Sequence, residues 1–204
     1  MIFQNFHSLT FVMKSNTIEL RGERIMITNG KRLEKVYEQD VKNGTVCIPI
    51  NVEIISVMAF ENIRSLQYIT IPHHVKYICE SAFENCKNLE TVKIENNSCI
   101  MEECIFRGCE NLQKINWPKG LNYIPKYTFE KCLKLQEFDI PKNVRRINDS
   151  AFSCCVSLKE IIIPQNVNII HFEAFDGCLN MQMYFHGKLY TYKDLKTYRI
   201  FTQG

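Results

Sequence analysis

The feature that most constrains this chain is a phenylalanine that returns every 23 residues. Six of its 13 phenylalanines keep this spacing: Phe60, Phe83, Phe106, Phe129, Phe152 and Phe175. A fixed period of this length is typical of an array in which each structural unit packs only on its neighbours. The sequence therefore predicts a repeat solenoid of six 23-residue units.

Other residue types keep the same register. A proline opens five of the six units, at Pro49, Pro72, Pro118, Pro141 and Pro164, and Glu95 replaces it in the third. A cysteine follows the phenylalanine by three residues in five units, at Cys86, Cys109, Cys132, Cys155 and Cys178. Half of the ten cysteines are thus explained as repeat residues.

Each unit closes with alternating apolar residues before its proline, such as Ile69 and Ile71. Period-two alternation that ends at a proline predicts one short strand per repeat. The segment around the repeated phenylalanine, such as residues 81–86, has no alternation and is too short for a full helix, so we expect a turn or a single 3₁₀ or α turn there. The fold should therefore be mostly β with little helix.

The pattern Leu-x-x-Ile-x-Ile-Pro-x-x-Val-x-x-Ile-x-x-x-Ala-Phe-x-x-Cys runs from Leu66 to Cys86 and recurs, with Phe138 at the first Ile, from Leu135 to Cys155. It resembles the BspA-type class of leucine-rich repeats over about residues 45 to 186. The resemblance implies a right-handed leucine-rich-repeat-like stack of short parallel strands. Members occur in bacteria and some protists, often as surface adhesins or interaction proteins, which implies recognition of protein partners.

Both ends of the chain keep the period poorly and are predicted to be caps. Residues 1–44 should contain a hairpin around residues 21–23 and a degenerate repeat near Tyr37. Residues 45–186 form the solenoid, in which His186 is expected to point inward. Residues 187–204 form a C-terminal cap that covers the last unit.

Composition and charge exclude several classes of protein. The 25 basic and 22 acidic residues are scattered, so no nucleic-acid-binding stripe is implied. No stretch approaches the roughly 18 apolar residues of a membrane span. Residues 1–8 lack an early basic residue and a continuous apolar run, so we expect no secretory signal and a cytoplasmic location. A cell-surface or secreted location is expected instead if the chain is a fragment.

The cysteines and histidines show no pattern typical of catalysis or metal binding. There is no Cys-x-x-Cys pair, and His7, His171 and His186 lie far apart. His73 and His74 fall in an expected exposed turn. No catalytic triad or phosphate-binding motif occurs. We therefore expect no enzyme activity, no cofactor and no metal, with buried repeat cysteines and with Cys47 and Cys154 as the thiols most open to oxidation.

If Ile69 and Ile71 point inward, Tyr68 and Thr70 point outward, and the period repeats this in every unit. The expected outward columns are Thr45, Tyr68, Thr91, Lys114, Glu137, Glu160 and Met183, and Cys47, Thr70, Lys93, Asn116, Asp139, Ile162 and Phe185.

The candidate partner-binding residues lie in these columns. Glu137, Asp139 and Glu160 should form an acidic cluster, and the remaining candidates are the apolar Ile162, Met183 and Phe185, the basic Lys93 and Lys114, and Tyr68. We predict a monomeric, non-enzymatic scaffold that binds a protein partner on this face. One alternative is a surface or secreted adhesin, without its targeting region, that binds host protein or glycan. Another is that the outward positions vary without binding anything.

Overall fold

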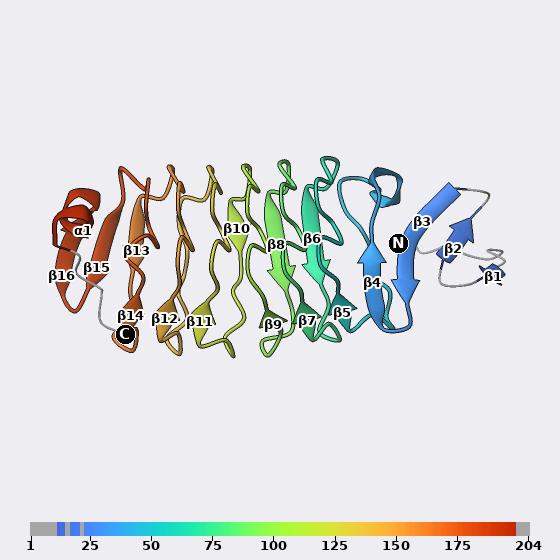
Figure 1. The fold of residues 1–204 in the computed structure, drawn as a ribbon, viewed down its shortest axis with the longest axis horizontal. Helices are drawn as coiled ribbons and strands as arrows, with labels where there is room; N and C mark the ends of the chain where they lie inside the picture. The colour runs from blue at the N-terminus through green and yellow to red at the C-terminus, as the bar shows by residue number, and fades with distance from the viewer. Residues whose placement is uncertain (1–11, 15–16, 21–22, 199–204) are drawn as a thin grey trace, which may run out of the picture.

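The structure, a computed structural model, describes residues 12–14, 17–20 and 23–198. Its turns stack along one long axis, with a strand-rich cap at one end and a short helix at the other (Figure 1). This arrangement confirms the predicted solenoid of short parallel strands.

One ladder consists of the strands that the apolar alternation predicts. These strands pair in parallel in the orders β6-β8-β10 and β13-β15. Their bounds are β6 (Tyr68–Ile71), β8 (Thr91–Ile94), β10 (Lys114–Ile115), β13 (Glu160–Ile162) and β15 (Gln182–Phe185). In β6 the side chains alternate between exposed and buried, as a strand with one face in the core requires. We call the outward side of this ladder the strand face.

A second ladder was not predicted. It contains one two-residue strand from each of six turns: β5 (Ile54–Ile55), β7 (Tyr77–Ile78), β9 (Ile100–Met101), β11 (Tyr123–Ile124), β12 (Arg146–Ile147) and β14 (Ile169–Ile170). They pair in parallel in the orders β5-β7-β9 and β11-β12-β14. Two residues are too short to leave an alternation signal, so the sequence showed only the inward residue of each strand, which is Ile in five of them and Met101 in β9.

The segment around each repeated phenylalanine forms consecutive tight turns, as expected. The amide of Glu84 donates to the carbonyl of Ser81, and the amide of Cys86 donates to that of Phe83. In five of the six turns two positions have a left-handed backbone, such as Ser81 at φ 55° and Asn85 at φ 57°, and the last turn has one, Gly177. Alternate amides in these turns donate to the next unit, so the turns also stack through backbone hydrogen bonds.

The core lies between the two ladders and is built from the repeat residues. The six repeated phenylalanines stack in one row, with neighbouring ring centroids 4.5 to 6.0 Å apart. The five repeat cysteines are buried, and each thiol donates to the carbonyl of a phenylalanine in the preceding unit, as Cys86 does to Phe60 at 2.9 Å. Burial raises the pKa of the Cys86 thiol to about 12, which keeps this donor protonated.

At the N-terminal end the chain runs antiparallel through β1 (Val12–Lys14), β2 (Thr17–Leu20), β3 (Glu23–Asn29) and β4 (Arg32–Lys35). The hairpin expected around residues 21–23 is the pair β2-β3, and its residues 21–22 lie outside the described residues. Residues 1–8, on which the expectation about a secretory signal rests, also lie outside them. β4 pairs in parallel with β5, so the ladder begins within the segment that we assigned to the cap. A 3₁₀ turn, η1 (Glu38–Asp40), follows.

At the C-terminal end the last turn is closed by β16 (Lys188–Thr191), which pairs antiparallel with β15, and by α1 (Tyr192–Tyr198). The Tyr192 hydroxyl donates to the Asp176 carboxylate at 2.9 Å, which fastens the helix to the final turn. Leu195 packs against the core from this helix.

Candidate protein-binding face

The strand face presents most of the predicted outward residues to solvent. Tyr68 is 46% exposed and Ile162 is 64% exposed. Lys93, Lys114, Glu137, Asp139 and Glu160 are exposed as well. Seven of the nine candidates therefore lie on the surface where the register placed them, and their role in binding stays a prediction.

The two candidates in the last strand are misplaced by the sequence analysis. Met183 is fully buried and Phe185 packs against the core, so both point inward. One residue is missing in this turn: two residues separate Leu158 from the inward Ile161, but only one separates Met181 from Met183. Glu160 accordingly pairs with Gln182, and Tyr184 points outward. The same shift places His186 in an exposed turn and not inward.

The strand-face ladder is interrupted in the middle of the candidate face. Residues 136–140 lie between β10 and β13 as a coil (Figure 1). Within the described chain, their only backbone hydrogen bond is from the Lys159 amide to the Gln136 carbonyl, at 3.2 Å. Five amides and four carbonyls of this coil therefore lack the partners that a continuous ladder would supply.

Aromatic residues account for the interruption. Trp117 and Phe138 occupy inward slots that hold aliphatic residues in the neighbouring units, and their rings meet edge to face at 6.1 Å. Phe138 also contacts Phe129 and Phe152 of the phenylalanine row, at 5.0 and 5.1 Å. The larger rings need more room than Ile or Val, and we attribute the loss of backbone pairing at this point to their packing. The sequence showed these two aromatics, but not this consequence.

A groove lies on each side of the coil. The first, between the coil and β13, has a volume of about 590 Å³ and is lined by residues that include Glu137, Asp139, Glu160 and Ile162. The second, between β10 and the coil, has a volume of about 610 Å³ and is lined by residues that include Trp117 and Asp139. The Trp117 indole Nε1 is buried and, among the described residues, has no hydrogen-bond partner.

The charges of the face are arranged unevenly. Among the described residues, the carboxylates of Glu137, Asp139 and Glu160 make no ion pair, so the acidic cluster is free to interact with a ligand. Lys93 pairs instead with Glu95 at 2.9 Å, so the predicted basic patch is partly neutralised. Lys142 and Lys159 also line the first groove, which makes it mixed in charge.

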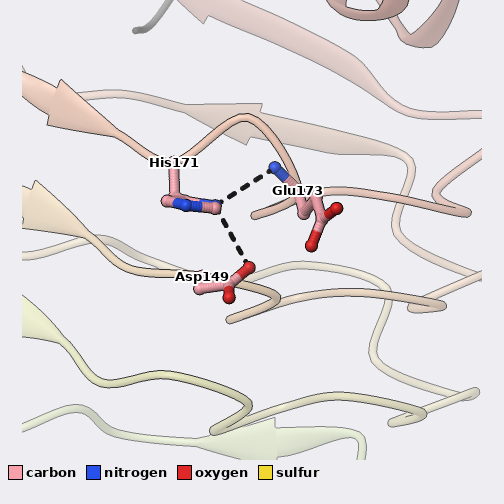
Figure 2. Close-up of side chains that lie close together, drawn as sticks. All are labelled: Asp149, His171 and Glu173. Carbon is pink, nitrogen blue, oxygen red and sulfur yellow. Dashed lines mark hydrogen bonds and ion pairs between the residues drawn. The ribbon is translucent and has the colours of Figure 1, made fainter. Parts of the chain in front are cut away.

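A second cluster forms where the sequence analysis expected no site. Figure 2 shows Asp149, His171 and Glu173 close together on two successive turns, and their ligand atoms all lie within 4.8 Å of one another. His171 Nδ1 is 3.1 Å from Asp149 Oδ1. The sequence predicts no site at His171, because no other histidine lies near it. The 23-residue period could have revealed this cluster. Position 149 in one unit is equivalent to position 172 in the next, and position 172 lies between His171 and Glu173.

Comparison with known proteins identifies the repeat. The family model for the BspA-type leucine-rich repeat region matches residues 35–182, in six copies. The chain belongs to the BspA-type leucine-rich repeat family. Comparison with curated proteins found no match.

Several solved bacterial leucine-rich repeat proteins resemble this BspA-type protein in fold. A protein from Eubacterium ventriosum is 21% identical, with a TM-score of 0.64, over 79% of this chain and 50% of its own. One from Bacteroides ovatus is 27% identical, with a TM-score of 0.58, over 86% of this chain and 50% of its own. A leucine-rich cell surface protein from Faecalibacterium prausnitzii is 20% identical, with a TM-score of 0.59, over 89% of this chain and 56% of its own. This chain thus spans about half the length of each of these three solved proteins.

Membership of the family indicates a general class of function. Leucine-rich repeat proteins are generally non-enzymatic scaffolds, and their repeats suggest a role in protein interaction. Among the described residues, no helix combines the length and the apolar character that crossing a bilayer requires.

Proposed function

We propose that this BspA-type protein is a monomeric, non-enzymatic scaffold that binds an extended segment of a partner protein along the coil at residues 136–140. The observation that carries this proposal is the row of unpaired backbone amides and carbonyls between two grooves. In the strands β6, β8 and β10, and in β13 and β15, the same groups pair with neighbouring turns.

An extended peptide is the ligand that such a row favours. Strand addition lets main-chain hydrogen bonds supply affinity while alternate side chains enter pockets that supply specificity. The first groove offers an exposed apolar contact at Ile162 beside the acidic cluster. A segment that alternates basic and aliphatic residues would complement both, and Lys142 and Lys159 would disfavour a continuous basic run.

A peptide-display experiment tests this proposal. The full chain is used to select from a library of random peptides of about ten residues, and the Kd of each enriched peptide is measured by fluorescence anisotropy. We expect basic-aliphatic sequences, and we expect Glu137→Lys/Asp139→Lys/Glu160→Lys to weaken their binding by about tenfold or more through like-charge repulsion. N-methylation of alternate peptide amides should abolish binding, because it removes the donors that pair with the coil.

The matched control places the same three charge changes elsewhere on the solenoid. Glu80→Lys/Glu102→Lys/Glu103→Lys alters three exposed acidic residues that follow strands of the second ladder. This variant should bind the selected peptides like the unaltered chain. Equal affinity of all three proteins, or no enrichment of any peptide, would contradict the proposal.

A second candidate function is that of a surface or secreted adhesin for host protein or glycan. Its support is that one protein of the same fold, from Faecalibacterium prausnitzii, is described as a cell surface protein, and that this chain spans about half of it. The genomic sequence upstream and downstream of this chain separates the two candidates. An in-frame signal or anchor would favour the adhesin, whereas their absence would favour a cytoplasmic scaffold.

A further inference from the structure

The corner that follows the second ladder brings three metal-binding residue types together. Asp149 lies two residues after β12, and His171 directly follows β14. β12 and β14 are neighbours in the ladder, with Ile147 paired to Ile170. The side chains of Asp149, His171 and Glu173 lie close together between these turns, with one ligand atom of each within 4.8 Å of the others (Figure 2).

We infer that Asp149, His171 and Glu173 form a binding site for one divalent transition-metal ion that prefers six ligands, such as Mn²⁺. The site lies on the second-ladder side of the solenoid and is independent of the peptide-binding proposal. Its three ligands would leave the other positions of the ion to water or to an exogenous group.

The distance between two of the ligand atoms suits such an ion. Metal bonds to imidazole nitrogen and carboxylate oxygen are about 2.1 Å long. Two ligand atoms 3.1 Å apart, as His171 Nδ1 and Asp149 Oδ1 are, then subtend an angle of about 95° at the metal. This angle is close to the right angle between adjacent ligands in an octahedron and smaller than the tetrahedral angle that zinc prefers.

The contact between His171 and Asp149 favours a positive charge at this point. The backbone amide of Glu173 also approaches His171 Nδ1, at 3.5 Å, and an ion bound to Nδ1 would replace this long contact because the nitrogen has a single lone pair. Asp149 Oδ1, an acceptor, approaches the same nitrogen. A lone pair and a carboxylate oxygen at this distance repel each other, so a proton on Nδ1 holds them together in the ion-free chain, and a bound metal ion would take the place of that proton.

Neighbouring hydroxyl groups hold the aspartate in place. The Ser150 hydroxyl donates to Asp149 Oδ1 at 3.2 Å, and the Tyr127 hydroxyl donates to Asp149 Oδ2 at 3.5 Å. Hydrogen bonds of this kind orient the ligands of metal sites. The Asp149 carboxylate is therefore positioned before an ion arrives.

The corner also has an excess of negative charge. Among the described residues, Asp149 pairs only with His171, and Glu173 makes no ion pair. The nearby Arg107 is engaged by Glu130, at 2.7 Å. A divalent cation would neutralise the two carboxylates of the cluster.

Manganese is the appropriate probe because the chain has ten free cysteines, which bind zinc through their thiolates but have little preference for Mn²⁺. The untagged full chain is titrated with MnCl₂ alone, and free Mn²⁺ is followed by its electron paramagnetic resonance signal. We expect one bound ion per chain and paramagnetic broadening of the His171 imidazole signals in the NMR spectrum. The broadening shows which histidine lies beside the ion in the unaltered protein.

The variants Asp149→Asn, His171→Gln and Glu173→Gln should each weaken Mn²⁺ binding by about tenfold or more, since loss of an orienting group alone weakens metal sites by about that factor. His73→Gln, in an exposed turn, is the matched control and should bind like the unaltered chain. Absence of Mn²⁺ binding, or binding that survives all three substitutions, would overturn the inference. Broadening of other histidines without that of His171 would overturn it too, because the ion would then be adventitious.

Discussion

At the scale of the residue, most turns of the repeat contain two backbone positions with a left-handed conformation. The second of them holds Asn62, Asn85, Gly108, Lys131, Cys154 and Gly177, all with positive φ. Gly and Asn adopt this conformation readily, whereas other residues are strained by about 1–2 kcal/mol. Lys131 and Cys154 are therefore the strained members of this row.

Lys131→Gly should stabilise the protein. Lys131 has φ 61° and an exposed side chain, so glycine relieves the strain without opening a cavity. We expect a gain of about 0.5–1 kcal/mol in the free energy of unfolding, after allowance for the greater freedom of glycine in the unfolded chain. Urea denaturation followed by circular dichroism measures it.

The equivalent glycine provides the control for this prediction. A β-carbon at Gly108, which has φ 71°, would collide with the side-chain oxygen of Asn85. Gly108→Ala should therefore lower the urea midpoint. A lower midpoint for Lys131→Gly as well would show that the left-handed position carries no strain.

At the scale of the element, charged side chains reinforce the start of the second ladder. Glu53, before β5, accepts from Lys31 of the preceding turn at 2.6 Å and from Lys76 of the following turn at 2.8 Å. Hydrogen bonds from Lys31 and Lys76 lower the pKa of Glu53 to about 2. Three successive turns are thus joined by one carboxylate.

This arrangement predicts a pH dependence of stability. The unfolded chain has its Glu53 pKa near the ordinary value of 4.5, so the folded state gains from the ionised carboxylate above that pH. The gain is lost as the pH falls from 4.5 towards 2. Urea denaturation over this range should show a shallower decline for Glu53→Gln than for the unaltered chain. Parallel declines, or an ordinary Glu53 pKa by NMR titration, would contradict the prediction.

At the scale of the whole molecule, stability comes from contacts between neighbouring turns, so position in the array matters. Phe106 stacks on Phe83 at 5.5 Å and on Phe129 at 6.0 Å. Phe175 ends the row and stacks only on Phe152, at 5.3 Å. Both are buried, but Phe106 has an aromatic neighbour on each side.

Phe106→Ala should therefore destabilise the protein more than Phe175→Ala does. Phe→Ala in a core costs about 3–5 kcal/mol, and one additional aromatic pair accounts for about 1 kcal/mol of difference between the two sites. Thermal and urea unfolding give the comparison, with hydrogen exchange to detect separate opening of the terminal turn. An equal or larger loss at Phe175 would show that the C-terminal cap and not the stacking row limits stability.

The sequence by itself determined the solenoid, its period, the inward and outward residues of most turns and the buried cysteines. It could do so because each slot of a repeat is filled by the same packing requirement, repeated six times. Deviations from the 23-residue period were visible in the sequence, but their effect on the direction of the side chains could not be inferred from it. One residue is missing after Met181, and the strands pair so that Gln182 lies opposite Glu160. Met183 therefore lies opposite the inward Ile161 and points inward as well.

Only the tertiary structure decided the two candidate sites. The coil at residues 136–140 depends on how the rings of Trp117 and Phe138 fit between adjacent turns, and no local pattern encodes that fit. The cluster of Asp149 and His171 depends on stacking, which brings residues 22 positions apart to 3.1 Å. Local signals specify what one turn looks like, whereas the contacts between turns arise only when the turns are packed together.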